Sequence, residues 1–159
     1  MTITVHPLTA TYEDWAHATI EREWGTALMV SRGVLYDVLT YPGFVALFDD
    51  QPQGLVTYRI DGKGCEILIL QSAIERQGIG AALVDKVRST AIKAGCKRLW
   101  LITTNDNIKA FRWYQRQGFM IKAVHVNALA KSRKLKPEIP LVGQDGIPLR
   151  DEIEFVMDL

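Results

Sequence analysis

The part of the chain that decides the fold is residues 65–119, which read CEILILQSAIERQGIGAALVDKVRSTAIKAGCKRLWLITTNDNIKAFRWYQRQGF. It begins with an apolar run at 65–70 that predicts a strand. After Gly78 the apolar residues recur with a helical period (Ile79, Leu83, Val87, Ala91, Ala94), which predicts an amphipathic helix ending at Gly95. An apolar run at 98–103 predicts a second strand, and residues 107–117 predict a second helix that stops at Gly118. A strand, a helix and a strand of these lengths predict a parallel crossover.

Short strands joined by turns precede this stretch. Apolar runs at 44–48 and 55–60 flank the turn-forming segment 49–54, and the segment 61–64 leads into the strand at Cys65. Further upstream the sequence predicts a helix over 13–24, capped at Thr11 and ended by Gly25, and a second helix over 28–39. We therefore expect an α+β fold whose mixed, mostly antiparallel central sheet is flanked by helices.

The bulk composition narrows the class of protein. The chain has 159 residues and a net charge of +1, which predicts a single domain, 1–159, with no nucleic-acid or membrane partner. The N-terminus lacks a signal-peptide pattern, and Cys65 and Cys96 lack metal-type spacing. We expect buried free thiols, no metal site and a cytoplasmic location.

A phosphate-binding loop is predicted where the strand at 65–70 runs into the next helix. Gly78 and Gly80 stand at the start of that helix, where backbone N–H groups can approach a ligand without a Cβ in the way. The Gly-Lys-Ser/Thr of a P-loop is absent. The dinucleotide fingerprint also fails, because Leu83 stands where a third small residue is needed. Taken alone, a Gly-x-Gly pair is more typical of a tight turn.

Two motifs that follow one another along the chain resemble those of the GNAT superfamily of N-acetyltransferases, and the C-terminal ending resembles that of its poorly characterised bacterial members. The family loop Gln/Arg-x-x-Gly-x-Gly/Ala is similar to residues 75–80, with Glu75 in place of the usual first residue. The family pattern Asn-x-x-Ala-x-x-x-Tyr-x-x-x-Gly-Phe is similar to residues 107–119, with Asn107 and Tyr114 in register. The resemblance implies a fold in which two strands splay apart to form a cleft for acetyl-CoA.

The resemblance also implies which residues bind acetyl-CoA. The backbone of one strand would hold the pantetheine arm as an added pseudo-strand (Leu68, Ile69, Leu70). The loop and first helical turn would cradle the pyrophosphate (Glu75, Arg76, Gln77, Gly78, Ile79, Gly80, Ala81). Asn105 or Asn107, together with Tyr114, would line the acetyl-thioester end.

Acetyl transfer to an amine predicts a catalytic acid and a catalytic base. Tyr114 is the candidate acid, because a phenol is matched to a thiolate leaving group; the alternative is that it only packs against its own helix face. Glu66 is the candidate base. Period-2 alternation would place Glu66, Leu68 and Leu70 on one face, toward the cleft; the alternative is an exposed strand carboxylate. Direct attack on the thioester in a ternary complex is the expected mechanism.

The acceptor is left open by the sequence. A small-molecule amine ranks first and a peptide or protein amine second, while a non-catalytic acetyl-CoA sensor is the alternative from another class. Residues 24–41 and the segment from His125 onward would contribute to its site, as in the family. The basic run at 131–136 is expected to be a solvated loop, and 152–157 predicts a final strand. The sequence is compatible with a monomer or a homodimer.

Overall fold

The structure is a computed structural model that describes residues 2–74 and 76–159. The chain forms two compact units. The first comprises the residues up to Leu28, Asp37–Leu99 and Leu159, and the second comprises Met29–Tyr36 and Trp100–Asp158. That residues 1–159 make one domain, and that two strands splay to form a cleft, both stay predictions.

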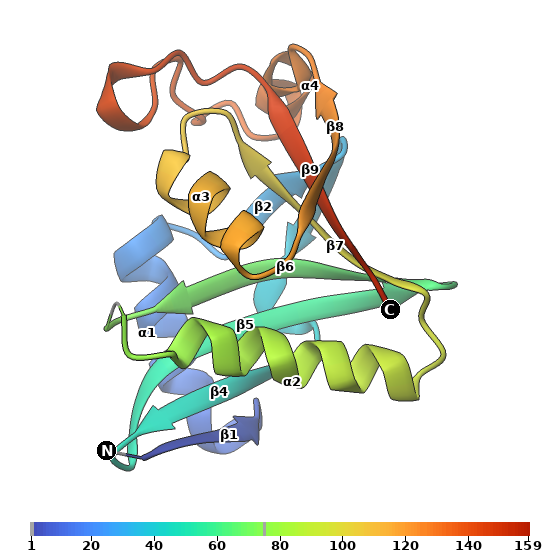
Figure 1. The fold of residues 1–159 in the computed structure, drawn as a ribbon. Coiled ribbons are helices and arrows are strands. Elements are labelled where there is room, and N and C mark those ends of the chain that lie inside the picture. Colours follow the sequence, from blue (N-terminus) through green and yellow to red (C-terminus); the bar gives the residue numbers. More distant parts are fainter. Residues whose placement is uncertain (1, 75) are drawn as a thin grey trace. The chain divides into compact units, whose positions relative to one another are not determined.

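The first unit is built on four strands in the order β1-β4-β5-β6. Their bounds are β1 Ile3–Pro7, β4 Gly43–Phe48, β5 Gln51–Asp61 and β6 Gly64–Ser72. Each neighbouring pair is antiparallel, as predicted for the meander from β4 to β6 (Figure 1). The sequence analysis missed β1. Its short run of alternating apolar and polar residues is only a weak signal for a strand, and its pairing with β4 is not visible in the sequence.

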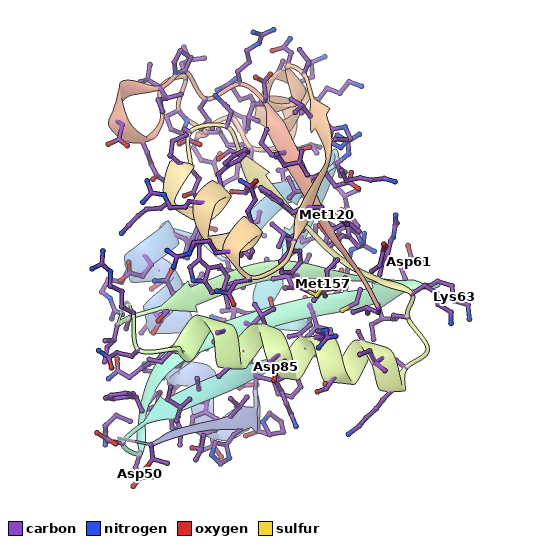
Figure 2. The ribbon with its side chains drawn as sticks, in the orientation of Figure 1. Asp50, Asp61, Lys63, Asp85, Met120 and Met157 are labelled. Atoms are coloured by element: carbon purple, nitrogen blue, oxygen red, sulfur yellow. The ribbon has the colours of Figure 1, made fainter. Side chains whose placement is uncertain are left out.

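The turn between β4 and β5 is shorter than predicted. Asp49 and Asp50 alone form it, both with positive φ (47° and 65°), and the strand resumes at Gln51. Aspartate tolerates this conformation better than most residues, because its short side chain can bond locally. Figure 2 shows Asp50 at this turn, and Asp61 and Lys63 at the β5–β6 turn toward the other end of the strands.

Two helices cover opposite faces of the four-stranded sheet. A Cβ added to Gly54 would lie 2.5 Å from Ile79 of α2 (Ile79–Lys93), so α2 packs directly on this face. α1 (Glu13–Trp24) lies on the other face, where the indole of Trp24 donates to Gln71 at 2.9 Å (Figure 1). The apolar residues between these layers are buried and form the core, among them Val45, Leu55, Val56, Leu83 and Val87.

The predicted helix 13–24 is confirmed as α1, and Gly25 ends it in the left-handed conformation (φ 77°). The predicted cap at Thr11 is wrong. Residues Ala10–Tyr12 form a short 3-10 helix, and Tyr12 occupies the cap position without a side-chain hydrogen bond. The 3-10 turn therefore shifts the start of α1 past the threonine.

The second unit contains β7 (Arg98–Thr104, entering from the first unit), β9 (Glu152–Asp158) and β8 (Met120–His125), in the order β7-β9-β8. α3 (Ile108–Arg116) packs on β9 through Phe155, a fully buried side chain. The predicted strands at 98–103 and 152–157 and the predicted helix at 107–117 are confirmed. The α+β class with a mostly antiparallel sheet and flanking helices is therefore confirmed.

The second predicted helix, 28–39, is wrong. The segment forms a hairpin of β2 (Leu28–Ser31) and β3 (Val34–Asp37), followed by a short 3-10 helix (Val38–Thr40). Arg32 and Gly33 both have positive φ (46° and 77°) and make a two-residue turn between runs rich in β-branched and aromatic residues. Such a turn matches the twist of the strands that flank it, which explains why a hairpin forms here.

The basic run at 131–136 is also not a loop, because α4 spans Ala128–Leu135. Arg133 anchors the chain that follows: its guanidinium donates to the carbonyl oxygens of Ile139 (3.3 Å), Pro140 (2.8 Å) and Leu149 (2.5 Å). A guanidinium that satisfies three carbonyls explains why part of the basic run folds as a helix rather than remaining solvated.

Candidate active site

The predicted phosphate loop leads into α2. Gly78 precedes the helix in the left-handed conformation (φ 81°), and Arg76 also has positive φ (62°). The first helical bond runs from the N–H of Ala82 to the carbonyl of Gly78 (3.0 Å), which leaves the preceding N–H groups of α2 without intrahelical partners. Gly78 provides no side-chain cap, and the first turn carries no acidic residue. The helix start therefore presents N–H groups that need partners outside the helix, together with the positive end of the helix dipole, the arrangement that binds phosphate.

The other loop residues lie near this helix start. Arg76 and Gln77 are exposed, whereas Ile79 is buried against the sheet; Gly80 and Ala81 are half-buried in the first turn. Glu75 lies outside the described residues. The predicted cradle is thus brought together at one helix terminus, apart from Glu75.

β6 contains an irregularity that the sequence analysis missed. In its register with β5, Ile67 opposes Tyr58 and Ile69 opposes Thr57, so that Leu68 is an extra residue without a cross-strand partner. A bulge of this kind shifts the alternation of side chains by one residue. The prediction that Glu66, Leu68 and Leu70 share one face is therefore wrong.

Glu66 lies on the face of the sheet that α1 covers. It opposes Arg59, on the same side of β5 as Thr57, and Leu70 opposes Val56 on the other side. The Glu66 side chain is only 2% exposed, and the Nε of Arg59 donates to its carboxylate at 2.8 Å. The alternative of an exposed carboxylate is therefore wrong as well, and Glu66 is a buried partner of a guanidinium.

A second polar group is buried on this face. The hydroxyl of Thr57 has no hydrogen-bond partner among the described residues. A buried hydroxyl without a partner costs about 1–3 kcal/mol, unless a water or a ligand satisfies it. The hydroxyl oxygen of Thr57 and the carboxylate of Glu66 thus lie on the same face of β5 and β6.

Tyr114 is buried in an aromatic cluster of the second unit. Its ring centroid lies 5.1 Å from that of Trp113, 5.5 Å from Phe119 and 6.0 Å from Phe155. Burial raises the pKa of the phenol above its ordinary value of 10.0. Tyr114 therefore keeps its proton at neutral pH, as a general acid must. Its ring also contributes to packing, which is the alternative role that the sequence left open.

The two candidate asparagines have different surroundings. Asn105 donates to the carbonyl of Pro148 (2.8 Å) and accepts from the N–H groups of Arg150 and Asp151 (3.0 Å each). Asn107 caps α3, because its side-chain oxygen accepts from the N–H of Ala110 (3.2 Å). Asn105 thus holds the C-terminal segment, and Asn107 fixes the start of the helix that carries Tyr114.

Asp106, between these asparagines, was missed by the sequence analysis. It is 5% exposed and accepts from the hydroxyl of Thr104 (2.5 Å) and the N–H of Gln144 (2.9 Å). A Cβ on Gly143 would lie 2.1 Å from its Oδ2, so only glycine fits there. Aspartate is common in turns, and the sequence contains no signal that this one is buried.

The two cysteines do not provide a nucleophile or a metal site. Cys65 and Cys96 are free and buried, as predicted. Burial, reinforced by the neighbouring Cys96 and Glu66, raises the pKa of the Cys65 thiol to about 12, which argues against a thiolate nucleophile. Within residues 2–74 and 76–159 no group of three His, Cys, Asp or Glu residues could hold a metal ion.

The sequence profile of the Acetyltransferase (GNAT) family matches residues 8–119, and the chain belongs to this family. Two curated proteins of Bacillus subtilis (strain 168) are similar over most of their length, and both are named uncharacterized proteins. YdhI is 46% identical over 135 residues, covering 84% of each chain. YxbD is 40% identical over 148 residues, covering 92% of this chain and 93% of its own.

A solved structure supports the fold. The crystal structure of a GNAT family acetyltransferase from Elizabethkingia anophelis, with acetyl-CoA bound, is similar with a TM-score of 0.70. The match covers 99% of this chain and 98% of that chain at 24% identity, so the likeness concerns the fold. Of the helices in the described part of the chain, none has the length and apolar character needed to cross a membrane.

Proposed function

We propose that the protein transfers an acetyl group from acetyl-CoA to a primary amine by direct attack in a ternary complex. The observation that carries this proposal is the start of α2. There the left-handed Gly78 provides no side-chain cap, and the following N–H groups lack intrahelical partners. Together with membership of the acetyltransferase family, this terminus supports a pyrophosphate at residues 76–81.

The donor's pantetheine arm would lie along the backbone of Leu68, Ile69 and Leu70. The bulge at Leu68 supports this placement, because an extra residue that lacks a partner in β5 is a place where a strand's ladder is interrupted. The oxyanion that develops on the thioester carbonyl would be met by a backbone N–H near Leu70.

Glu66 and Tyr114 would handle the protons of the transfer. The acceptor ammonium loses a proton to Glu66, directly or through a water that the buried Thr57 hydroxyl would also bond. The neutral nitrogen forms the new N–C bond while the C–S bond breaks. The thiolate of CoA then takes the proton of Tyr114, whose raised pKa keeps it protonated until that moment. The nitrogen carries a surplus proton once the N–C bond has formed, and it gives this proton to the Tyr114 phenolate. Glu66 then releases the first proton to solvent, so that the ammonium and the thioester yield one amide, one thiol and one proton.

Binding of the donor is tested by thermal unfolding with acetyl-CoA. Ligand at a hundred times its dissociation constant stabilises the folded state by about 2.7 kcal/mol. The exposed Arg76 flanks the helix start, so Arg76→Glu should weaken binding about tenfold by repelling the pyrophosphate. Arg88→Glu, a matched change at an exposed position further along α2, should leave binding unchanged. No shift at millimolar acetyl-CoA would refute the proposal.

The non-catalytic sensor is the second candidate, and turnover distinguishes it from the enzyme. Release of free thiol is measured across a panel of amines and peptides, with CoA-free and amine-free controls. An enzyme releases thiol only when both substrates are present. A protein that binds acetyl-CoA and releases no thiol with any acceptor would be a sensor.

A further inference from the structure

The buried hydroxyl of Thr57 has a defined direction within the first unit. Thr57 is fully buried, and its hydroxyl has no hydrogen-bond partner among the described residues. Its γ-methyl group points toward β4, because a Cβ added to Gly43 would lie 2.9 Å from that methyl group. The hydroxyl is the other branch at the same Cβ, so it points away from the contact with Gly43.

Glu66 is the charged neighbour of this hydroxyl. It opposes Arg59, which follows Thr57 by two residues and therefore shares its face of β5. Thr57 and Glu66 are thus diagonal neighbours on adjacent strands, a relationship that puts Cα atoms about 7–8 Å apart. At that spacing one water molecule can bond both side chains, because each of its hydrogen bonds spans about 2.8 Å.

Arg59 occupies the carboxylate without being able to exchange a proton with it. Its Nε donates to the Glu66 carboxylate at 2.8 Å. A guanidinium has donors only and stays charged, so it cannot take a proton from Glu66. The Glu66 side chain is also only 2% exposed, which keeps it from direct contact with bulk solvent. Proton exchange with Glu66 therefore needs a carrier inside the protein.

We infer that a water molecule is bound between the Thr57 hydroxyl and the Glu66 carboxylate, and that Thr57 positions this water as the proton carrier for Glu66. A buried water makes about three hydrogen bonds to polar groups that otherwise lack partners. The hydroxyl donates and accepts and the carboxylate accepts, so these two groups supply two of the bonds. Thr57, Arg59 and Glu66 all belong to the first unit.

The catalytic part of this inference rests on the proposed function and specifies its first proton transfer. The acceptor ammonium gives a proton to the water, and the water passes one of its own protons to the Glu66 carboxylate. The nitrogen becomes neutral, Glu66 becomes a carboxylic acid, and the water is regenerated. Thr57 acts through the water, so it is a positioning residue.

Thermal unfolding of the protein without ligands tests the water site. Thr57→Val keeps the shape of the side chain and removes the hydroxyl. If the hydroxyl holds a water, the variant loses a hydrogen bond and Tm should fall by about 3 °C. A hydroxyl that truly lacks a partner gives the opposite sign, because its removal ends a desolvation cost. An unchanged or raised Tm would therefore overturn the inference.

A double-mutant cycle tests whether the water also bonds Glu66. Thr57→Val should change Tm little in the variant Arg59→Met/Glu66→Met, because the water has already lost its carboxylate there. An equal loss of Tm in both backgrounds would show that Thr57 is satisfied without Glu66, and would overturn the inference as well.

Turnover tests the positioning role separately. Thr57→Val should lower kcat about tenfold and leave the dissociation constant of acetyl-CoA unchanged. Thr57→Ser restores the hydroxyl and should recover most of kcat, which a purely structural role of the threonine methyl would not allow. Unchanged kcat in Thr57→Val overturns the positioning role. If the wild-type protein turns over no acceptor, the proposed function fails, while the comparison of Tm values still decides the water site.

Discussion

The carboxylate of Glu66 lies 2.8 Å from the Nε of Arg59, directly across the β5–β6 hairpin. Glu66 is almost completely buried, while Arg59 keeps 21% of its side chain exposed and also lies 3.5 Å from Asp61. The guanidinium thus connects a buried carboxylate with the solvent-facing end of the hairpin. The residue we propose as the base is therefore held in position before any substrate arrives.

Replacing Arg59 by Met should strongly destabilise the fold, because it leaves the buried Glu66 without its guanidinium. Removal of one partner of a buried ion pair costs about 3–5 kcal/mol, whereas exchange of both partners for apolar residues is often nearly neutral. We expect a loss of about 3 kcal/mol in urea unfolding for Arg59→Met, and recovery of most of it in Arg59→Met/Glu66→Met. A double variant no more stable than the single one would show that Glu66 is satisfied by other groups.

Tyr114→Phe should lower kcat about a hundredfold and leave the dissociation constant of acetyl-CoA unchanged, because only the proton donor to the thiolate is removed. Burial raises the pKa of Tyr114 above 10.0, so the wild-type rate should not fall at alkaline pH until above that value. The neighbouring Trp113→Phe is a control that conserves the aromatic packing and should change kcat little. Unchanged turnover in Tyr114→Phe would eliminate the phenol as the acid.

The same burial makes the fold sensitive to alkali. The folded-state pKa of Tyr114 is raised above that of the unfolded chain, so its contribution to stability is complete below pH ~10 and is lost as the pH rises further. The Cys65 thiol, with its pKa raised from 9.0 to about 12, loses its contribution over that interval. The midpoint of urea unfolding should fall steeply above pH ~9, and less steeply in Cys65→Ala. Identical pH profiles for the variant and the wild type would refute the linkage.

Gly143→Ala should destabilise the second unit by about 2 kcal/mol, because the new Cβ would lie 2.1 Å from the Oδ2 of the buried Asp106. The comparison variant is Gly146→Ala, at a positive φ of 73° but with open space around the new Cβ. It isolates backbone strain and should cost about 1 kcal/mol. Equal decreases in melting temperature for both variants would mean that the Asp106 side chain can move away from the new Cβ without loss of stability.

The sequence was most informative where local patterns decide the structure. The glycines that end α1 and precede α2, and the helical period of α2, were interpreted correctly because they depend on nearby residues alone. The pairing of Arg59 with Glu66 could also have been predicted: the two-residue turn at Gly62 and Lys63 fixes the hairpin register and puts these charges opposite one another.

Other features depend on contacts that a local pattern does not contain. The bulge at Leu68 reverses the side-chain alternation that had been expected for β6, and no residue type marks its position. The segment 28–37 carries a helix-like spacing of apolar residues, but the Arg32–Gly33 turn and the contact with Glu152 favour a hairpin. Asn105 is one of the two asparagines expected at the thioester end, and no local pattern indicates that its amide bonds to the C-terminal segment.

The loop before α3 bonds the C-terminal segment and also starts the helix that follows it. Asn105 and Asp106 bond the segment 143–151, and the next residue, Asn107, starts the helix of Tyr114. A chimera that received a relative's C-terminal segment without the matching loop would deprive the buried Oδ2 of Asp106 of its hydrogen bond from the N–H of Gln144. Exchange of the segment 143–151 between relatives will therefore require the loop before α3 to be exchanged with it.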